Sequence, residues 1–222
     1  MLNARQLKLI ACVSMIFSHT GVIFWPSQVW WQIPGRIAMP IFAFMIANGA
    51  RMSRNVWQYL TRLLVFAALI QYPYSVFLAN GRLNICFTLG LGLAAIIAWQ
   101  SSLPVIARLT MVLAACLTAE WLNAEYGWYG IMMIFFSHIF FTERRMLAIG
   151  WVALNAVLLW QMTSDLLAGD TYPQVQGLCL LALPLVLLYD GKRGGGWRWE
   201  FYAFYIGHLA LLYALRRALW GF

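Results

Sequence analysis

Two histidines stand inside apolar stretches, where a polar side chain is costly. His19 follows Ser18 near the end of the first apolar run, and His208 lies in Tyr205-Ile206-Gly207-His208-Leu209 within the last one. An ionisable side chain in such a segment needs a partner or a cavity, so it marks a candidate functional position. A neutral imidazole can take a proton from an attacking nucleophile, which makes both histidines candidate general bases.

Each histidine also has a purely structural interpretation. Inside a membrane helix, an imidazole can simply bond a carbonyl of a neighbouring helix. His19 is favoured for function because it combines depth, the adjacent hydroxyl of Ser18 and a nearby basic residue, Arg36. His208 stays open between the two interpretations. His138 lies close to Glu143-Arg144-Arg145 and is favoured as an interfacial residue.

Arg36 begins the second apolar run, in Ile33-Pro34-Gly35-Arg36-Ile37-Ala38-Met39-Pro40. Pro40 has no backbone N–H, so it frees a carbonyl in the first turns of the helix that follows. Arg36 could bond such carbonyls, or it could hold an anion near His19.

These residues must be positioned by helices that cross a membrane. The chain has 222 residues and is 63% hydrophobic but only 10% charged, whereas a soluble domain carries about 25% charged residues. A spanning helix needs about 20 apolar residues. The sequence therefore predicts an all-α fold, a polytopic transmembrane helix bundle of about nine helices, with 1–222 as a single integral membrane domain. The expected spans are 6–25, 36–51, 58–79, 85–100, 104–121, 127–141, 146–163, 174–189 and 200–216.

The basic residues predict the orientation of the bundle. With the N-terminus in the cytoplasm, eleven of the fifteen Lys and Arg residues fall on the inner side, as the positive-inside bias favours. The outer four are Arg36, Arg82, Arg216 and Arg217. This bias accounts for the net charge of +8 without a nucleic-acid partner.

Residue spacing disfavours several familiar kinds of site. The four cysteines lie singly in apolar runs, so they predict neither a disulfide framework nor a zinc site. We find no H-x-x-x-H, H-E-x-x-H or carboxylate-rich span, and we expect no metal. The nucleotide motif G-x-x-x-x-G-K-[ST] and the serine elbow G-x-S-x-G are also absent from the sequence.

Several stretches resemble the TraX family. Gly35-Arg36-Ile37-Ala38-Met39-Pro40-Ile41-Phe42-Ala43-Phe44 is similar to the most distinctive motif of that family. Leu7-Lys8-Leu9-Ile10 with Ser18-His19-Thr20-Gly21 resembles its first span. The resemblance extends over nearly the whole chain through Asn84-Ile85-Cys86-Phe87, Tyr126-Gly127 with Gly130, and Phe204-Tyr205 leading to His208-Leu209-Ala210.

The resemblance implies a multi-pass acetyltransferase of the bacterial inner membrane. Such an enzyme would move an acetyl group from cytoplasmic acetyl-CoA to the N-terminal amine of a conjugative pilin, with His19 as the catalytic histidine. The family usually has Asp directly before this histidine, where this chain has Ser18. A hydroxyl can orient an imidazole but brings no charge. Asp165 and Glu125, both expected outside, are candidates to supply a carboxylate or to attract the cationic amine.

A mechanism follows from this topology. The phosphates of acetyl-CoA are expected on Arg51, Arg54 and Arg62, through charge-assisted hydrogen bonds, although positive-inside anchoring would also explain each of these residues. His19 or His208 would then take the proton of the amine, and Arg36 would stabilise the oxyanion. A covalent acetyl-histidine is the alternative to direct transfer.

Three other functions stay open at this point. The acceptor could be a sugar, a lipid headgroup or a different peptide. A non-catalytic chaperone that holds pilin in the membrane would need only apolar helices and G-x-x-x-G-like packing. Membrane lipid is an expected partner in every case. A carrier is disfavoured because the chain shows no repeated halves.

Overall fold

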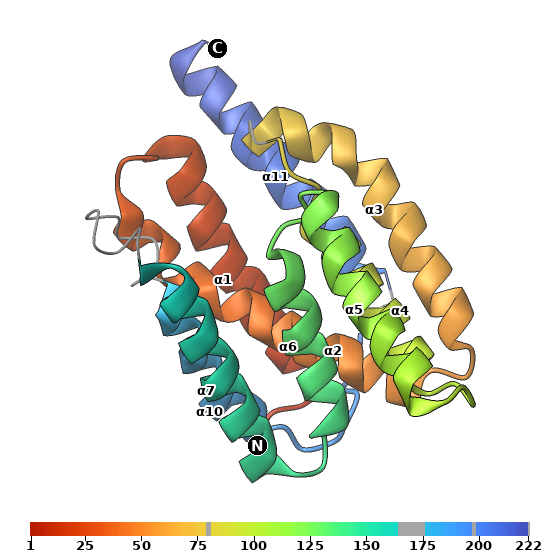
Figure 1. Cartoon of the computed structure of the whole chain (residues 1–222). Helices are drawn as coiled ribbons and strands as arrows, with labels where there is room; N and C mark the ends of the chain where they lie inside the picture. Colours follow the sequence, from red (N-terminus) through yellow and green to blue (C-terminus); the bar gives the residue numbers. More distant parts are fainter. Residues whose placement is uncertain (79–80, 164–175, 197–198, 222) are drawn as a thin grey trace. The chain divides into compact units, whose positions relative to one another are not determined.

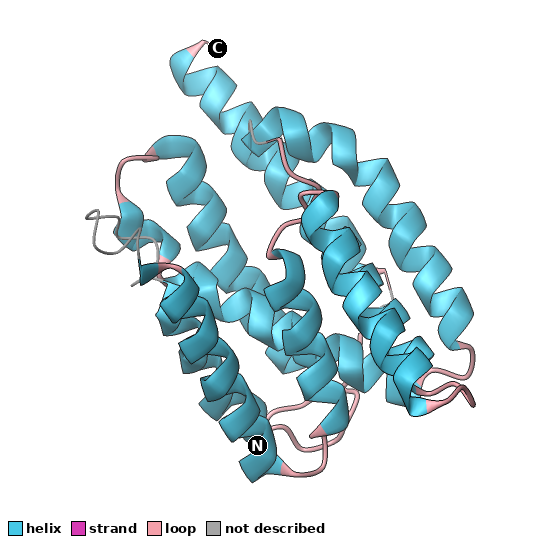
Figure 2. Cartoon of the chain, in the orientation of Figure 1, coloured by secondary structure: helices cyan, strands magenta, loops and turns pink. Residues whose placement is uncertain are grey.

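The computed structural model describes residues 1–78, 81–163, 176–196 and 199–221. Over these ranges the fold is all-α, with nine α-helices, three short 3-10 helices and no strand (Figures 1 and 2), which confirms the predicted fold class. The α-helices are α1 (Ala4–Phe24), α2 (Ala38–Met52), α3 (Val56–Leu78), α4 (Ile85–Trp99), α5 (Val105–Trp121), α6 (Gly127–Ile139), α7 (Arg144–Gln161), α10 (Ala182–Leu187) and α11 (Glu200–Trp220). The 3-10 helices are η1 (Val29–Gln32), η2 (Pro34–Ile37) and η3 (Leu178–Leu181).

Within the described ranges, three stretches are long and apolar enough to cross a membrane. They are Ala4–Phe24, Val29–Met52 and Val56–Leu78, the second of which joins η1, η2 and α2. The predicted span 174–189 differs most from the structure. Its described part consists of η3 followed by the six-residue helix α10. Pro184 lies in the first turn of α10, where its missing N–H costs little.

Polar side chains set the starts of two helices. At α1, Asn3 Oδ1 accepts from Gln6 N and Gln6 Oε1 accepts from Asn3 N, both at 2.9 Å, which forms a capping box. At α4, Asn84 Oδ1 accepts from Cys86 N at 3.0 Å. Both caps satisfy amides that the first turn of a helix leaves without partners.

The chain divides into two compact units. Unit 1 contains Met1–Phe42, Val76–Ala79 and Asn155–Phe222, and unit 2 contains Ala43–Ser75 and Asn80–Leu154. Each unit is described by itself below. The expectation that 1–222 forms one membrane domain stays a prediction.

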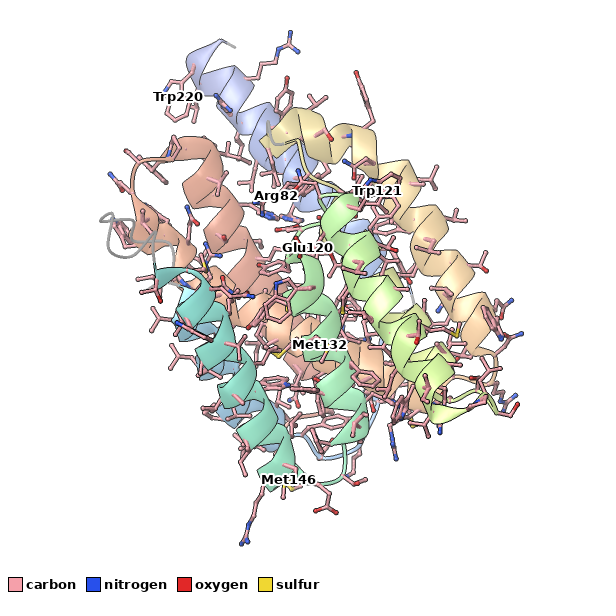
Figure 3. The ribbon with its side chains drawn as sticks, in the orientation of Figure 1. Arg82, Glu120, Trp121, Met132, Met146 and Trp220 are labelled. Carbon is pink, nitrogen blue, oxygen red and sulfur yellow. The ribbon has the colours of Figure 1, made fainter. Side chains whose placement is uncertain are left out.

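In unit 1, the first and last helices run parallel. Arg5 near the start of α1 donates to both carboxylate oxygens of Glu200 at the start of α11, at 2.8 and 3.2 Å. Phe24 at the end of α1 lies against Trp220 at the end of α11, with ring centroids 5.3 Å apart. Figure 3 labels Trp220 near the C-terminus. Because both starts meet and both ends meet, α1 and α11 have the same direction.

The segment before α11 closes the N-terminal end of α1. Leu2 N donates to Leu188 O at 2.8 Å, and Ala4 N, an amide of the first helical turn, donates to Lys192 O at 2.9 Å. This arrangement brings Lys192 to the same end of the unit as Arg5. Two residues predicted to lie on the inner side are therefore at one end of unit 1.

In unit 2, helices α4, α5 and α6 enclose an apolar core. A side chain at Gly92 would overlap the tip of Ile134, so glycine lets α4 approach α6 closely. At the far end of α5, Glu120 accepts from Trp128 N at 2.6 Å and connects this helix to the start of α6 (Figure 3). The buried core residues are Ala95, Val112, Cys116, Ala119, Ala124, Ile131 and Phe135.

Candidate active site

One face of α1 is shaped to receive the segment that carries Arg36. Ser14, Ser18 and Gly21 recur at helical spacing and therefore share this face. Ser14 Oγ donates to Pro34 O. A Cβ at Gly35 would overlap the Ser18 side chain, and one at Gly21 would overlap Trp31. Small side chains thus let η1 and η2 lie directly on α1.

His19 of α1 and His208 of α11 contact each other within unit 1. His19 Nδ1 lies 2.8 Å from His208 Nε2. The other nitrogen of His208, Nδ1, lies 2.8 Å from the carbonyl oxygen of Phe204, one helical turn earlier. The imidazole planes are 8° from parallel. The parallel packing of α1 and α11 therefore joins two residues that are 189 positions apart.

The hydrogen bonds determine which nitrogen carries each proton. A carbonyl oxygen only accepts, so His208 Nδ1 must donate to Phe204 O. In a neutral imidazole the other nitrogen then has a lone pair, so His208 Nε2 accepts from His19 Nδ1. His19 Nε2 is left with a lone pair and makes no hydrogen bond with any residue that the structure describes. It is therefore an oriented base with its basic nitrogen available.

Arg36 is buried beside this face of α1 and is held by two amides. Its Nη1 donates to Gln176 Oε1 at 2.9 Å, and its Nη2 donates to Gln32 Oε1. Arg36 is 7% exposed and Gln176 is 3% exposed. Sequence reasoning missed both glutamines. The four-residue spacing of Gln32 and Arg36 could have indicated the first contact, but Gln176 is 140 residues away and no local signal indicates it.

Ser18 has a packing role in unit 1. Its side chain fills the contact with Gly35, and no hydrogen bond from it to His19 is found in the described part of the chain. The acceptor that orients the His19 ring is His208 rather than Ser18, because His19 Nδ1 bonds His208 Nε2. Asp165, the predicted outer carboxylate, falls outside the described residues.

Glu125 belongs to unit 2 and precedes α6. Its Oε2 accepts from Tyr74 Oη at 3.1 Å, and its backbone oxygen accepts from Thr88 Oγ1. The loop before α4 lies alongside, through paired contacts between Leu83 and Ala124. Glu125 thus connects three helices of unit 2, and its predicted part in attracting an amine stays a prediction.

The three arginines predicted to bind acetyl-CoA also belong to unit 2. The Arg51 guanidinium lies 4.7 Å from the Phe141 ring centroid, and that of Arg62 lies 5.4 Å from the Tyr59 ring. Arg54 is exposed in the turn between α2 and α3. Aromatic faces stabilise cations without neutralising them. These ring contacts do not test whether the three arginines bind phosphate, so their role in binding acetyl-CoA stays a prediction.

His138 of α6 is enclosed within unit 2. It is 8% exposed, and its Nε2 lies 3.4 Å from Gln100 Nε2 of the residue that follows α4. Sequence reasoning favoured an interfacial position for this residue. That position at the membrane interface stays a prediction.

The comparisons with known proteins decide the family. The chain matches the family model described as "TraX protein" over residues 3–216. The chain belongs to the TraX family. This membership confirms the resemblance seen in the sequence. Together with the apolar stretches of the described residues that are long enough to span a bilayer, it makes the chain a membrane protein.

Two curated relatives cover almost the whole chain. The probable fimbrial assembly protein FimC, serogroup H1, of Dichelobacter nodosus is 29% identical, over 95% of this chain and 94% of the relative. Protein TraX of Escherichia coli is 27% identical, over 93% of this chain and 84% of the relative. No solved structure matches the chain. The name of the first of these relatives links that protein to fimbrial assembly.

Proposed function

We propose that this TraX-family protein is a membrane-embedded acetyltransferase that modifies the N-terminal amine of a pilin subunit. The acetyl donor is cytoplasmic acetyl-CoA, and the acceptor is presented at the outer side of the inner membrane. One observation carries the proposal: the bond between His19 and His208 leaves His19 Nε2 as an oriented base. The name of a relative as a probable fimbrial assembly protein supports a pilin partner.

The chemistry needs a base at the amine. An N-terminal amine has a pKa of about 7.7–8.0, and only its neutral form attacks a thioester. As the nitrogen bonds to the acetyl carbon, its surplus proton passes to His19 Nε2. The carbon–sulfur bond then breaks, and the CoA thiolate leaves and takes a proton from His19. The products are an acetylated amine and CoA thiol, and His19 returns to its starting state.

His208 takes the place of a carboxylate before His19, because its Nε2 accepts from His19 Nδ1 and thereby orients the imidazole. When His19 gains a proton at Nε2, its Nδ1–H becomes a charged donor, and its bond to His208 Nε2 strengthens. His208 stays neutral because its own Nδ1–H already bonds Phe204 O. The positive charge therefore stays on His19 and is stabilised by the neutral imidazole of His208, so Ser18 is compatible with the same general-base chemistry.

The donor and the orientation complete the proposal. Arg51, Arg54 and Arg62 would hold the phosphates of acetyl-CoA on the cytoplasmic side. Two of these residues, Arg51 and Arg54, are exposed, which supports contact with a ligand from solution. The N-terminus would be cytoplasmic, at the end of unit 1 where Arg5 and Lys192 come together. Arg36 would stabilise the oxyanion of the thioester.

The decisive experiment is the intact mass of a pilin subunit. The pilin is co-expressed with the wild-type protein, with His19→Ala, or with the control His138→Gln, which alters a buried histidine of unit 2. We expect the mass of one acetyl group with the wild type and the control, and none with His19→Ala. Full acetylation with His19→Ala would overturn the role of His19. If no variant adds mass, the acceptor is different or the protein is a pilin chaperone.

A further inference from the structure

The imidazole of His208 is held along its edge by two hydrogen bonds. Its Nδ1 donates to Phe204 O, and its Nε2 accepts from His19 Nδ1, both at 2.8 Å. Rotation about the χ2 torsion of a histidine is soft, because this torsion joins an sp³ carbon to an sp² ring. Bonds at the edge alone therefore leave the ring able to tilt. A group on the face of the ring is needed to hold its plane.

The bond between the two histidines depends on that plane. Their ring centroids are 5.1 Å apart and their planes are 8° from parallel. This separation is close to the largest that a contact of 2.8 Å between the two nitrogens allows, so the rings lie edge to edge in nearly one plane. The lone pair of His208 Nε2 lies in its ring plane and points at His19 Nδ1. Tilting His208 would turn this lone pair away, and a hydrogen bond weakens steeply as its angle closes.

The ring of Phe204 lies flat against the His208 imidazole. The two centroids are 4.7 Å apart and the planes are 10° from parallel, which is an offset stack. The residues are four apart on α11, where side chains of neighbouring turns meet. Tyr205 also contacts His208, but its ring is at 81° to the imidazole and cannot lie flat on it. Phe204 thus contacts one imidazole twice, at Nδ1 through its carbonyl and at the face through its ring.

We propose that the ring of Phe204 is a positioning group, which holds the plane of His208 and, through the bond between the histidines, the direction of His19 Nε2. The carbonyl of Phe204 selects the tautomer of His208, and the ring selects its tilt. The effect on the reaction rate rests on the proposed role of His19 as general base.

Three substitutions separate this role from simple packing. Phe204→Leu keeps an apolar side chain and the backbone carbonyl but removes the flat face. Phe204→Tyr keeps the flat face and should restore the wild-type behaviour. The matched control is Phe201→Leu, on the same helix and also half-buried. The Phe201 ring faces Lys8 Nζ, 5.1 Å from its centroid, and the residue lies about 10 Å along the helix from His208.

The hydrogen bond between the histidines can be measured without any turnover. The sequence contains three histidines, so His138→Gln leaves only the pair of unit 1. The full-length protein with this change carries ¹⁵N-labelled histidine and is studied by NMR in lipid nanodiscs. We expect a nitrogen–nitrogen coupling across the bond from His19 Nδ1 to His208 Nε2. Phe204→Leu should weaken or abolish this coupling, whereas Phe204→Tyr and Phe201→Leu should keep it.

The same proteins are then assayed with acetyl-CoA and a peptide of the pilin N-terminus. For Phe204→Leu we expect kcat to fall about threefold to tenfold, in proportion to the loss of one aromatic stack. The KM for acetyl-CoA should not change, because the donor does not contact this ring. Phe204→Tyr and Phe201→Leu should keep the wild-type kcat. In a protein that already carries His208→Ala, Phe204→Leu should cause no further loss.

The proposal fails if Phe204→Leu keeps the coupling at full strength, or if Phe201→Leu loses as much coupling and activity as Phe204→Leu. It also fails if Phe204→Tyr does not recover them. Phe204→Met, which also lacks a flat face, serves as the test variant if Phe204→Leu does not fold. A coupling that depends on Phe204 in a protein that transfers no acetyl group would overturn the proposed function alone, and the positioning of His208 would stand.

Discussion

The histidines of the two units are buried in different ways. In unit 1, the bonds that begin at Phe204 O pass through His208 and end at His19 Nε2, on a side chain that is half-buried. In unit 2, His138 Nδ1 is buried without a hydrogen-bond partner among the described residues. The comparison teaches that burial alone does not make a base. The line of hydrogen bonds must end on a nitrogen that a substrate can reach.

The other buried polar side chains also differ between the units: in unit 2 they hold a loop in place, and in unit 1 they orient groups that could do chemistry. Asn84 of unit 2 is fully buried and donates to Ala67 O and to Gln71 Oε1, at 2.9 and 2.8 Å. It also accepts from Cys86 N, so its side chain bonds only within the unit. This network fixes the loop before α4. In unit 1, the contacts of His208 and of the two glutamines orient a base and a cation, which are groups suited to chemistry.

The largest effect is expected from His19→Ala. Loss of a general base typically lowers a rate by about 10²–10⁴-fold, and we expect that loss in the acetylation rate of a pilin peptide. Thermal stability should fall much less than the rate, because the variant loses one hydrogen bond and one ring contact, both with His208. If His19→Ala kept a rate within tenfold of wild type, His19 would not be the general base. The histidines of the two units would then no longer differ in function.

His208→Ala should have the next largest effect, roughly tenfold to a hundredfold on the same rate, because one hydrogen bond to a charged group is lost. His208→Gln is the matched variant, since its amide oxygen can still accept from His19 Nδ1. We expect it to recover most of the lost activity. Equal losses in both variants would mean that His208 acts by packing rather than by accepting that bond.

A pair of glycine substitutions compares the helix contacts of the two units. Gly35→Ala should lower the free energy of unfolding by about 1–3 kcal/mol, because the Ser18 atoms that it meets are close to the α1 backbone. Gly92→Ala meets the tip of the Ile134 side chain first, and this tip can turn away. The Ile134 Cβ and Cγ2 lie at 3.0 Å and need to shift only slightly, so we expect a smaller loss. Denaturation midpoints in the same detergent measure both. A larger loss at Gly92 would contradict this ranking.

The smallest effect is expected from His138→Phe. Removing a buried nitrogen without a partner should stabilise unit 2, by about 1 kcal/mol. Gln100 is exposed, so its amide can bond water once the imidazole is gone. Acetylation of the pilin peptide should be unchanged. A loss of that activity would show that the third histidine has a role beyond the structure of unit 2.

Local sequence pattern was sufficient for most of the helices. Apolar runs and their Gly and Pro breaks predicted eight of the nine spans to within a few residues of the observed helices, from α1 to α7 and at α11. These features act over a few turns, so they can be seen in a single stretch. The span 174–189 was less accurate because an apolar run does not distinguish a continuous helix from a 3-10 turn joined to a short one.

The partners of the candidate site could be predicted only in part. His19, His208 and Arg36 were recognised because each is polar within an apolar run. The contact between the two histidines depends on the parallel packing of α1 and α11, and the contact of Arg36 with Gln176 depends on a segment far along the chain. Such pairings arise from tertiary packing, which no local spacing records.

The parallel arrangement of α1 and α11 has a consequence for synthesis. A ribosome makes about 5–20 residues per second, so the 189 residues from His19 to His208 take roughly 10–40 s to appear. Throughout that interval the first helix carries an imidazole that has no partner to orient it. Only α11 supplies that partner. A truncated product that ends before α11 would therefore lack the oriented base.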